Sequence, residues 1–81
     1  METLGQRLRI LRQRRVWTQY DLAAAAGLPQ ATINRIENGR NQPRVSTVRK
    51  LADALGIDPA QLAFGEAPDQ LGPVNEKGGV N

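Results

Sequence analysis

The 81-residue sequence contains no cysteine and no histidine, and it has one tryptophan, one tyrosine and one phenylalanine. Without cysteine and histidine the chain offers no disulfide framework, no thiol chemistry, no imidazole base and no zinc-finger ligands. Paired carboxylates and a glycine-rich phosphate loop are missing as well, so we predict no enzymatic activity and no cofactor or metal. At this length, one small domain is the most that the chain can form.

Long apolar runs are also absent. No stretch approaches the roughly 18 residues that a membrane-spanning helix needs, and no signal-peptide pattern opens the sequence. We therefore expect a cytoplasmic protein without membrane contacts.

Charge is unevenly distributed along the chain, which has 11 Lys and Arg residues against 8 Asp and Glu residues. Residues 1–64 carry a net charge of +5, whereas residues 65–81 carry a net charge of −2. Nine of the cations are arginine, whose planar guanidinium donates two parallel hydrogen bonds to phosphates and base edges. A solvated basic surface also fits this composition, so the charge by itself favours an anionic partner only weakly.

Apolar residues recur at helical spacing and predict five short helices. Glycine or asparagine follows several of these segments, where a positive backbone φ ends a helix. The predicted helices cover residues 3–15, 19–26, 30–38, 45–55 and 59–64. Residues 65–81 are rich in Gly and Pro and lack periodicity, so we expect a flexible acidic tail. The predicted fold class is therefore all-α, with a domain at 1–64 followed by this tail.

The same patterns predict which side chains are buried. The first helix should have an apolar stripe and a basic outer face of arginines. Trp17 should form a hydrophobic staple with Leu22 around the capping box of Thr18 and Asp21, which makes it a core residue and not a ligand platform. The predicted apolar stripe of the fourth helix consists of Val45, Val48, Leu51, Ala52 and Leu55. The pattern does not decide between the core and a dimer surface for three apolar residues: Ile57, Leu62 and Phe64.

The second and third predicted helices, joined by a short glycine turn, favour a helix-turn-helix unit. Ala23 is a small residue at the expected contact between the two helices, and Gly27 stands in the turn. A generic helical hairpin would not need both of these together with apolar anchors at fixed offsets. The other inward positions are Leu22, Ala26, Leu28, Ile33 and Ile36.

Over residues 4–64 the sequence resembles the Cro/CI-type (lambda-repressor-like, XRE) DNA-binding domain. The resemblance rests on Thr18-Gln19, Leu22-Ala23, Gly27, Gln30-Ala31-Thr32-Ile33, Ile36-Glu37-Asn38-Gly39, Pro43, Leu51-Ala52 and Ala54-Leu55-Gly56. It implies a five-helix domain whose second and third helices form the helix-turn-helix. It also implies a homodimer that binds a pseudo-palindromic operator in double-stranded DNA and regulates transcription, with repression favoured.

The resemblance also assigns DNA-contacting roles to individual residues. In the third helix, which would enter the major groove, the base-reading residues would be Gln30, Ala31, Thr32, Asn34 and Arg35. The chemistry fits, because an amide pairs with adenine and a guanidinium with guanine. Contacts to the DNA backbone or minor groove would come from Gln19, Asn38, Arg40 and Arg44. Arg12 and Glu37 would form a partly buried ion pair between the first and third helices, a role we favour over phosphate contact.

Three residues depart from the family pattern. Pro29 stands where Ser or Thr commonly caps the recognition helix, and Arg44 stands where Ser often caps the fourth helix. Val16 occupies a site that is often Gly or Asn, and a β-branched residue there would be strained if the backbone required a positive φ.

A second hypothesis is an antitoxin, in which a DNA-binding core is followed by a tail that binds and inhibits a toxin. The core does not discriminate between the two hypotheses. The tail has only Leu71, Val74 and Val80 as large apolar residues, which is little for a tight protein interface. We therefore favour the transcriptional regulator.

Overall fold

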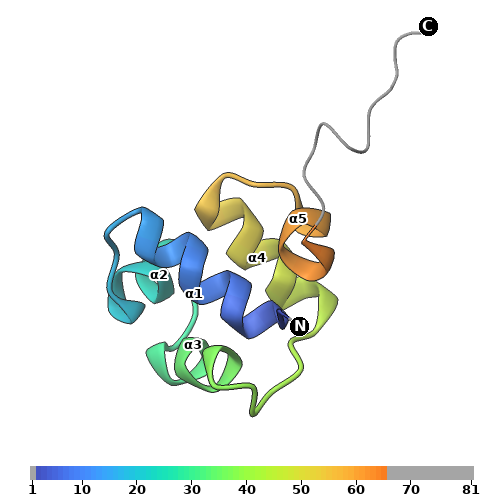
Figure 1. The fold of residues 1–81 in the computed structure, drawn as a ribbon. Helices are drawn as coiled ribbons and strands as arrows, with labels where there is room; N and C mark the ends of the chain where they lie inside the picture. Colours follow the sequence, from blue (N-terminus) through green and yellow to red (C-terminus); the bar gives the residue numbers. More distant parts are fainter. Residues whose placement is uncertain (1, 66–81) are drawn as a thin grey trace, which may run out of the picture.

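Five α-helices follow one another in the computed structural model, which describes residues 2–65 (Figure 1). They are α1 (Leu4–Arg14), α2 (Gln19–Ala26), α3 (Gln30–Glu37), α4 (Val45–Leu55) and α5 (Pro59–Phe64). The all-α prediction is confirmed, and no strand occurs within the described range. None of these helices is long and apolar enough to cross a bilayer. The predicted tail lies outside the described residues from position 66 onward.

The helices begin where the sequence supplies capping side chains. The Thr18 hydroxyl accepts from the Asp21 backbone N–H at 3.1 Å, and Asp21 Oδ2 accepts from the Thr18 N–H at 2.8 Å, which confirms the predicted capping box. Thr3 and Gln6 form a second capping box at the start of α1, in addition to the predicted one. Gly27 ends α2 with a φ of 68°, a conformation that costs other residues more.

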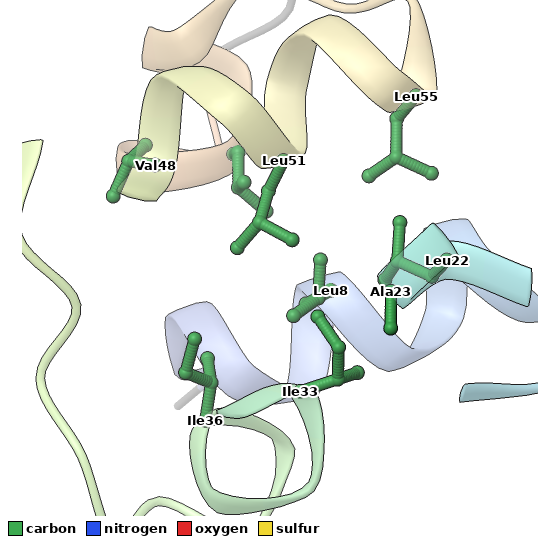
Figure 2. Close-up of a cluster of buried hydrophobic side chains, with 9 residues drawn as sticks. Leu8, Leu22, Ala23, Ile33, Ile36, Val48, Leu51 and Leu55 are labelled. Carbon is green, nitrogen blue, oxygen red and sulfur yellow. The ribbon is translucent and has the colours of Figure 1, made fainter. Parts of the chain in front are cut away.

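The core lies between α1, α2 and α3 on one side and α4 and α5 on the other. Figure 2 shows Leu51 of α4 pointing toward Leu8 of α1, and Leu55 of α4 pointing toward Leu22 of α2. Burial of each such side chain stabilises the fold by about 1.5–3 kcal/mol. Helix α1 packs on α3 and α5, and α2 packs on α3 and α4. The large fully buried side chains are Leu8, Leu22, Ile33, Ile36, Leu51, Leu55 and Leu62.

The structure corrects one predicted core position at the start of α4 and settles two positions in α5 that the sequence left open. Val45 is 67% exposed, so its predicted burial is wrong. It is the first residue of α4, one turn before Val48, and the core begins only at Val48. Leu62 is a core residue, whereas Phe64 is 72% exposed. Trp17 is half-buried and packs against the core, as predicted.

Val16 is the one non-glycine residue with a positive φ among residues 2–65. Its φ is 57° and its side chain is 90% exposed. A β-branched residue in this region stores strain of about 1–3 kcal/mol. The strain expected for a positive φ at this position is therefore present, and burial of the side chain does not compensate for it.

Candidate nucleic-acid interface

Helices α2 and α3 form the predicted helix-turn-helix. Their contact is close because Ala23, which is 3% exposed, lies in the buried cluster with Ile33 and Ile36. Gly27 turns the chain, and the Leu28 N–H donates to the Ala23 carbonyl at 2.9 Å. The turn therefore fixes the position of α3 relative to α2.

One face of α3 is buried and the opposite face is exposed. Ile33 and Ile36 point into the core (Figure 2), and the helical period turns the positions between them outward. Thr32 is half-buried, at the border between the two faces. The other predicted base-reading residues are exposed: Gln30, Ala31, Asn34 and Arg35.

Both α3 and α4 begin without a side-chain cap. Pro29 precedes α3 and Arg44 precedes α4, and neither provides an oxygen for the first backbone N–H groups. The two departures from the family pattern therefore each leave a helix without a side-chain cap. The uncapped ends leave N–H groups and a partial positive charge available for an anion.

Arg12 and Glu37 form a buried ion pair between α1 and α3. Arg12 Nε lies 2.6 Å from Glu37 Oε2, and Arg12 Nη2 lies 2.9 Å from Oε1. Burial by itself would raise the pKa of Glu37, but hydrogen bonds from Arg12, Gln19 and Arg9 outweigh it and hold this pKa below its ordinary value. The hydrogen bond to Glu37 in turn raises the pKa of Arg12. Arg12 also donates to the Trp17 carbonyl at 2.7 Å.

Three predicted DNA-contacting amides lie together beside this pair. Gln19 is half-buried and donates to Glu37 Oε1 at 3.1 Å. The side-chain oxygen of Gln19 accepts from the Asn34 amide at 3.4 Å, and the side-chain oxygen of Asn34 accepts from the Asn38 amide at 3.2 Å. The three amides therefore form one hydrogen-bonded row that ends at Glu37.

The remaining predicted cations are exposed. Within residues 2–65, no carboxylate lies at ion-pair distance from Arg35, Arg40 or Arg44. Arg44 lines a shallow hollow of about 350 Å³ between α3 and α4, which also contains Thr32, Thr47 and Lys50. Lys50 was not among the predicted contacts, because its place beside α3 depends on the path of the 38–44 loop, which no local pattern predicts.

Arg7 of α1 and Arg15, which directly follows α1, bind the ends of other helices. Arg7 donates to the carbonyls of Leu62 and Ala63 at 2.8 and 2.7 Å, so the basic outer face predicted for this helix is wrong at Arg7. Arg15 donates to the Leu55 carbonyl at 2.5 Å, and its guanidinium lies 5.2 Å from the centroid of the Trp17 ring. The guanidinium groups of Arg7 and Arg15 therefore make hydrogen bonds within the folded domain.

Known proteins resemble the chain along this part of the sequence. The model of the family described as "Helix-turn-helix domain" matches residues 3–64. The HTH-type transcriptional repressor RghR of Bacillus subtilis is 48% identical over 58 residues, which are 70% of this chain and 43% of RghR. The chain therefore spans less than half the length of this curated relative. More distantly, the antitoxin HipB of Escherichia coli is 32% identical over 71 residues, which are 83% of this chain and 76% of HipB.

Solved structures share the arrangement of the helices. The restriction-modification controller protein C.AhdI of Aeromonas hydrophila matches with a TM-score of 0.71 and 37% identity, over 73% of this chain and 89% of C.AhdI. The P22 c2 repressor, solved with a synthetic operator, matches with a TM-score of 0.76 over 82% of this chain and all of that chain. At 24% identity, this second likeness concerns the fold alone. Because the family model covers residues 3–64 and the folds agree, the chain belongs to the helix-turn-helix domain family, of the Cro/CI type.

Proposed function

We propose that the protein is a sequence-specific, double-stranded DNA-binding regulator of transcription that acts as a repressor. The observation that carries the proposal is the exposed face of α3, where Gln30, Ala31, Asn34 and Arg35 lie together on a rigid helix-turn-helix. We infer that the protein works in the cytoplasm as a binding protein and not as an enzyme.

In this proposal α3 enters the major groove with its N-terminal end toward the bases. Gln30 pairs with adenine through its amide, and Arg35 pairs with guanine through two parallel N–H groups. Ala31 is small enough to let the helix approach the base edges closely. Thr32, at the border of the exposed face, directs its methyl group toward thymine.

Contacts to phosphate hold the domain on the duplex. Arg40 follows α3 and Arg44 precedes α4, and both are exposed. Arg44 shares its hollow with Lys50 beside the uncapped start of α4, a combination that attracts a phosphate. Gln19 and Asn38 contribute amide groups at the two ends of the row. These phosphate contacts fix the position of α3 on the duplex, and the contacts to base edges determine which DNA sequence is preferred.

We also propose that the protein binds its operator as a homodimer with half-sites roughly 34 Å apart. An apolar hollow of about 590 Å³ supports this arrangement, since exposed Val45 and Phe64 line it together with Leu4, Pro59 and Ala63. A second copy of the chain would cover these side chains.

The antitoxin hypothesis remains the alternative, and the likeness to HipB favours it. It depends on residues 65–81, which lie outside the described residues beyond Gly65. A toxin gene beside the gene for this protein would support the antitoxin hypothesis. Inhibition of that toxin by the full chain, but not by residues 1–65, would establish it.

Selection from random double-stranded DNA tests the proposed function. The purified full chain should enrich a pseudo-palindromic sequence whose halves are one helical turn apart. If no sequence is enriched at low or at high salt, the protein is not a sequence-specific regulator.

A further inference from the structure

Five polar side chains from α1, α2 and α3 close a ring of hydrogen bonds beside the exposed face of α3. Arg9 Nη2 donates to Asn38 Oδ1 at 3.3 Å, and Asn38 Nδ2 donates to Asn34 Oδ1 at 3.2 Å. Asn34 Nδ2 donates to Gln19 Oε1 at 3.4 Å, and Gln19 Nε2 donates to Glu37 Oε1 at 3.1 Å. Arg9 Nε closes the ring by donating to the same Glu37 oxygen at 3.4 Å. We call these five residues the polar ring.

From Arg9 through Asn38, Asn34 and Gln19 to Glu37, the hydrogen bonds of the polar ring run in one direction. The guanidinium of Arg9 can only donate, and the carboxylate of Glu37 can only accept. Each of the three amides between them therefore turns its carbonyl toward Arg9 and its NH₂ group toward Glu37. Reversal of a single amide would place two donors or two acceptors face to face and leave hydrogen bonds unmade.

The orientation of these amides determines what they present to DNA. Beyond the ring, each amide retains one N–H and one oxygen lone pair. The major groove distinguishes base pairs by the order of donors and acceptors. An amide of fixed orientation can therefore discriminate between bases, whereas an amide that turns over freely can match more than one pattern.

Arg9 is not needed to neutralise Glu37. Arg12 binds this carboxylate through two shorter hydrogen bonds, at 2.6 and 2.9 Å. Arg9 is 46% exposed and lies farther from the carboxylate, at 3.4 Å. Its distinct contribution is the hydrogen bond to Asn38, which orients the row from the Asn38 end, while Glu37 orients it from the Gln19 end.

We propose that Arg9 is a positioning residue for DNA sequence readout, acting through Asn38 to fix the orientation of the Asn34 and Gln19 amides. The inference rests on the proposed function. It differs from a simple phosphate contact, in which Arg9 would strengthen binding to every sequence equally.

The first test observes the amides in the free protein by two-dimensional ¹H–¹⁵N NMR of the full chain. Arg9→Met should shift the side-chain NH₂ signals of Asn38, Asn34 and Gln19, although it touches only the first of these amides. Arg9→Lys, which keeps a hydrogen-bond donor, should leave these NH₂ signals unchanged. Arg14→Met is the matched control, because Arg14 is an exposed arginine of α1 that lines a different surface, with Gln61. If Arg9→Met shifts only the Asn38 signals, the relay does not exist and the proposal is wrong.

The second test measures affinity for the selected DNA site and for each of its single-base variants. For Arg9→Met we expect about a tenfold loss of discrimination at one or two base positions, with Arg9→Lys and Arg14→Met close to the original protein. Thermal unfolding of each variant identifies any loss of fold.

Two outcomes would contradict the proposal. If Arg9→Met weakens DNA binding equally for all sequences, and lowers the slope of log affinity against log salt by about 0.9, Arg9 is a phosphate contact. Unchanged discrimination with a lower unfolding temperature would make it structural. Either result overturns the proposal.

The two proposals fail in different ways. If the unmodified chain shows no base preference, the proposed function fails, and the readout role of Arg9 fails with it. If the unmodified chain prefers one site and Arg9→Met retains that preference, only the role of Arg9 is wrong.

Discussion

At the scale of single residues, Glu37 contributes both to the stability of the fold and to the candidate interface. Its buried carboxylate accepts hydrogen bonds from Arg12 and Arg9 of α1 and from Gln19 of α2. Removal of Arg12 would leave a buried charge without its main partner, which costs about 3–5 kcal/mol. The same carboxylate ends the row of amides on the exposed side. We therefore expect a change at Glu37 to affect folding and, through these amides, the proposed contacts to DNA.

Glu37 should make the domain sensitive to acid. Its pKa is lower in the folded protein than in the unfolded chain, so its stabilisation is present above the ordinary glutamate pKa and is lost as pH falls through the folded value. We expect the free energy of unfolding to fall from about pH 5 downward. Urea denaturation at a series of pH values measures this, and NMR of the Glu37 carboxyl carbon follows the titration directly. Titration of Glu37 at its ordinary pKa would contradict the prediction.

Gln30 should contribute base preference without contributing stability. Its side chain is exposed on α3, so Gln30→Ala should leave the unfolding temperature nearly unchanged. It should relax the preference at one base position, at a cost of about 1–3 kcal/mol. Repeated DNA selection checks this, with Gln13→Ala, which removes an exposed amide from α1, as the control. An unchanged consensus for Gln30→Ala would show that Gln30 does not read the base assigned to it.

At the scale of elements, α1 and the residue that follows it bind the C-terminal ends of other helices through arginine side chains. Arg7 binds the last carbonyls of α5, and Arg15 binds the last carbonyl of α4. The final carbonyls of a helix lack partners within the helix and carry a partial negative charge. Helix α1 therefore acts as a clamp on both neighbours.

Loss of Arg7 should loosen α5 before the rest of the fold. Hydrogen bonds from charged groups contribute about 1.5–3 kcal/mol each, and Arg7 makes two to α5. For Arg7→Met we expect hydrogen exchange at the α5 amides to accelerate markedly, while exchange in α2 changes little. Arg14→Met, which removes an exposed arginine from the same helix, should leave both rates unchanged. Equal acceleration in α2 and α5 would mean that Arg7 stabilises the whole domain and not α5 in particular.

How far the sequence predicts the structure depends on the range of the interaction. The helices follow from spacing and caps within a few residues, and the exposure of Gln30 and Arg35 follows from the burial of Ile33 and Ile36. The direction of Arg7 does not, because its partner carbonyl at Leu62 lies 55 residues away. An arginine that faces solvent and one that binds a distant helix end have the same local pattern.

At the scale of the whole molecule, the chain separates its cations by role. Arg7, Arg12 and Arg15 are bound within the fold. By contrast, exposed cations surround α3 and the start of α4, at Arg40 and Arg44. The count of 11 Lys and Arg residues therefore overstates the number of cations that can meet a phosphate.

Arg40 should strengthen binding to all DNA sequences alike. Arg40→Ala should weaken the selected site and unrelated sites by the same factor and lower the slope of log affinity against log salt by about 0.9. Titrations at several salt concentrations measure this, with Arg14→Ala as a charge-matched control. A selective loss at one base position would instead assign Arg40 to base readout.

Phe64 should contribute to self-association. Phe64→Ser removes an exposed aromatic side chain from the apolar hollow beside Val45, and we expect dimerisation to weaken at least about tenfold. Sedimentation equilibrium measures the change. Tyr20→Ser, which removes an aromatic side chain that is 66% exposed on α2, should have no such effect. Equal dimerisation in the Phe64 variant would place the interface elsewhere.

The two-faced character of α3 has a consequence for how binding preference can change over evolution. Ile33 and Ile36 hold the helix in the core, and the exposed positions of the same helix contribute little to that packing. Under the proposed readout, substitutions at Gln30, Ala31 or Arg35 would therefore redirect the protein to new sites while the fold persists. Asn34 is the exception, because it also bonds to Gln19 and Asn38. Its replacement changes its neighbours too, so we expect diverging relatives to alter these three positions together.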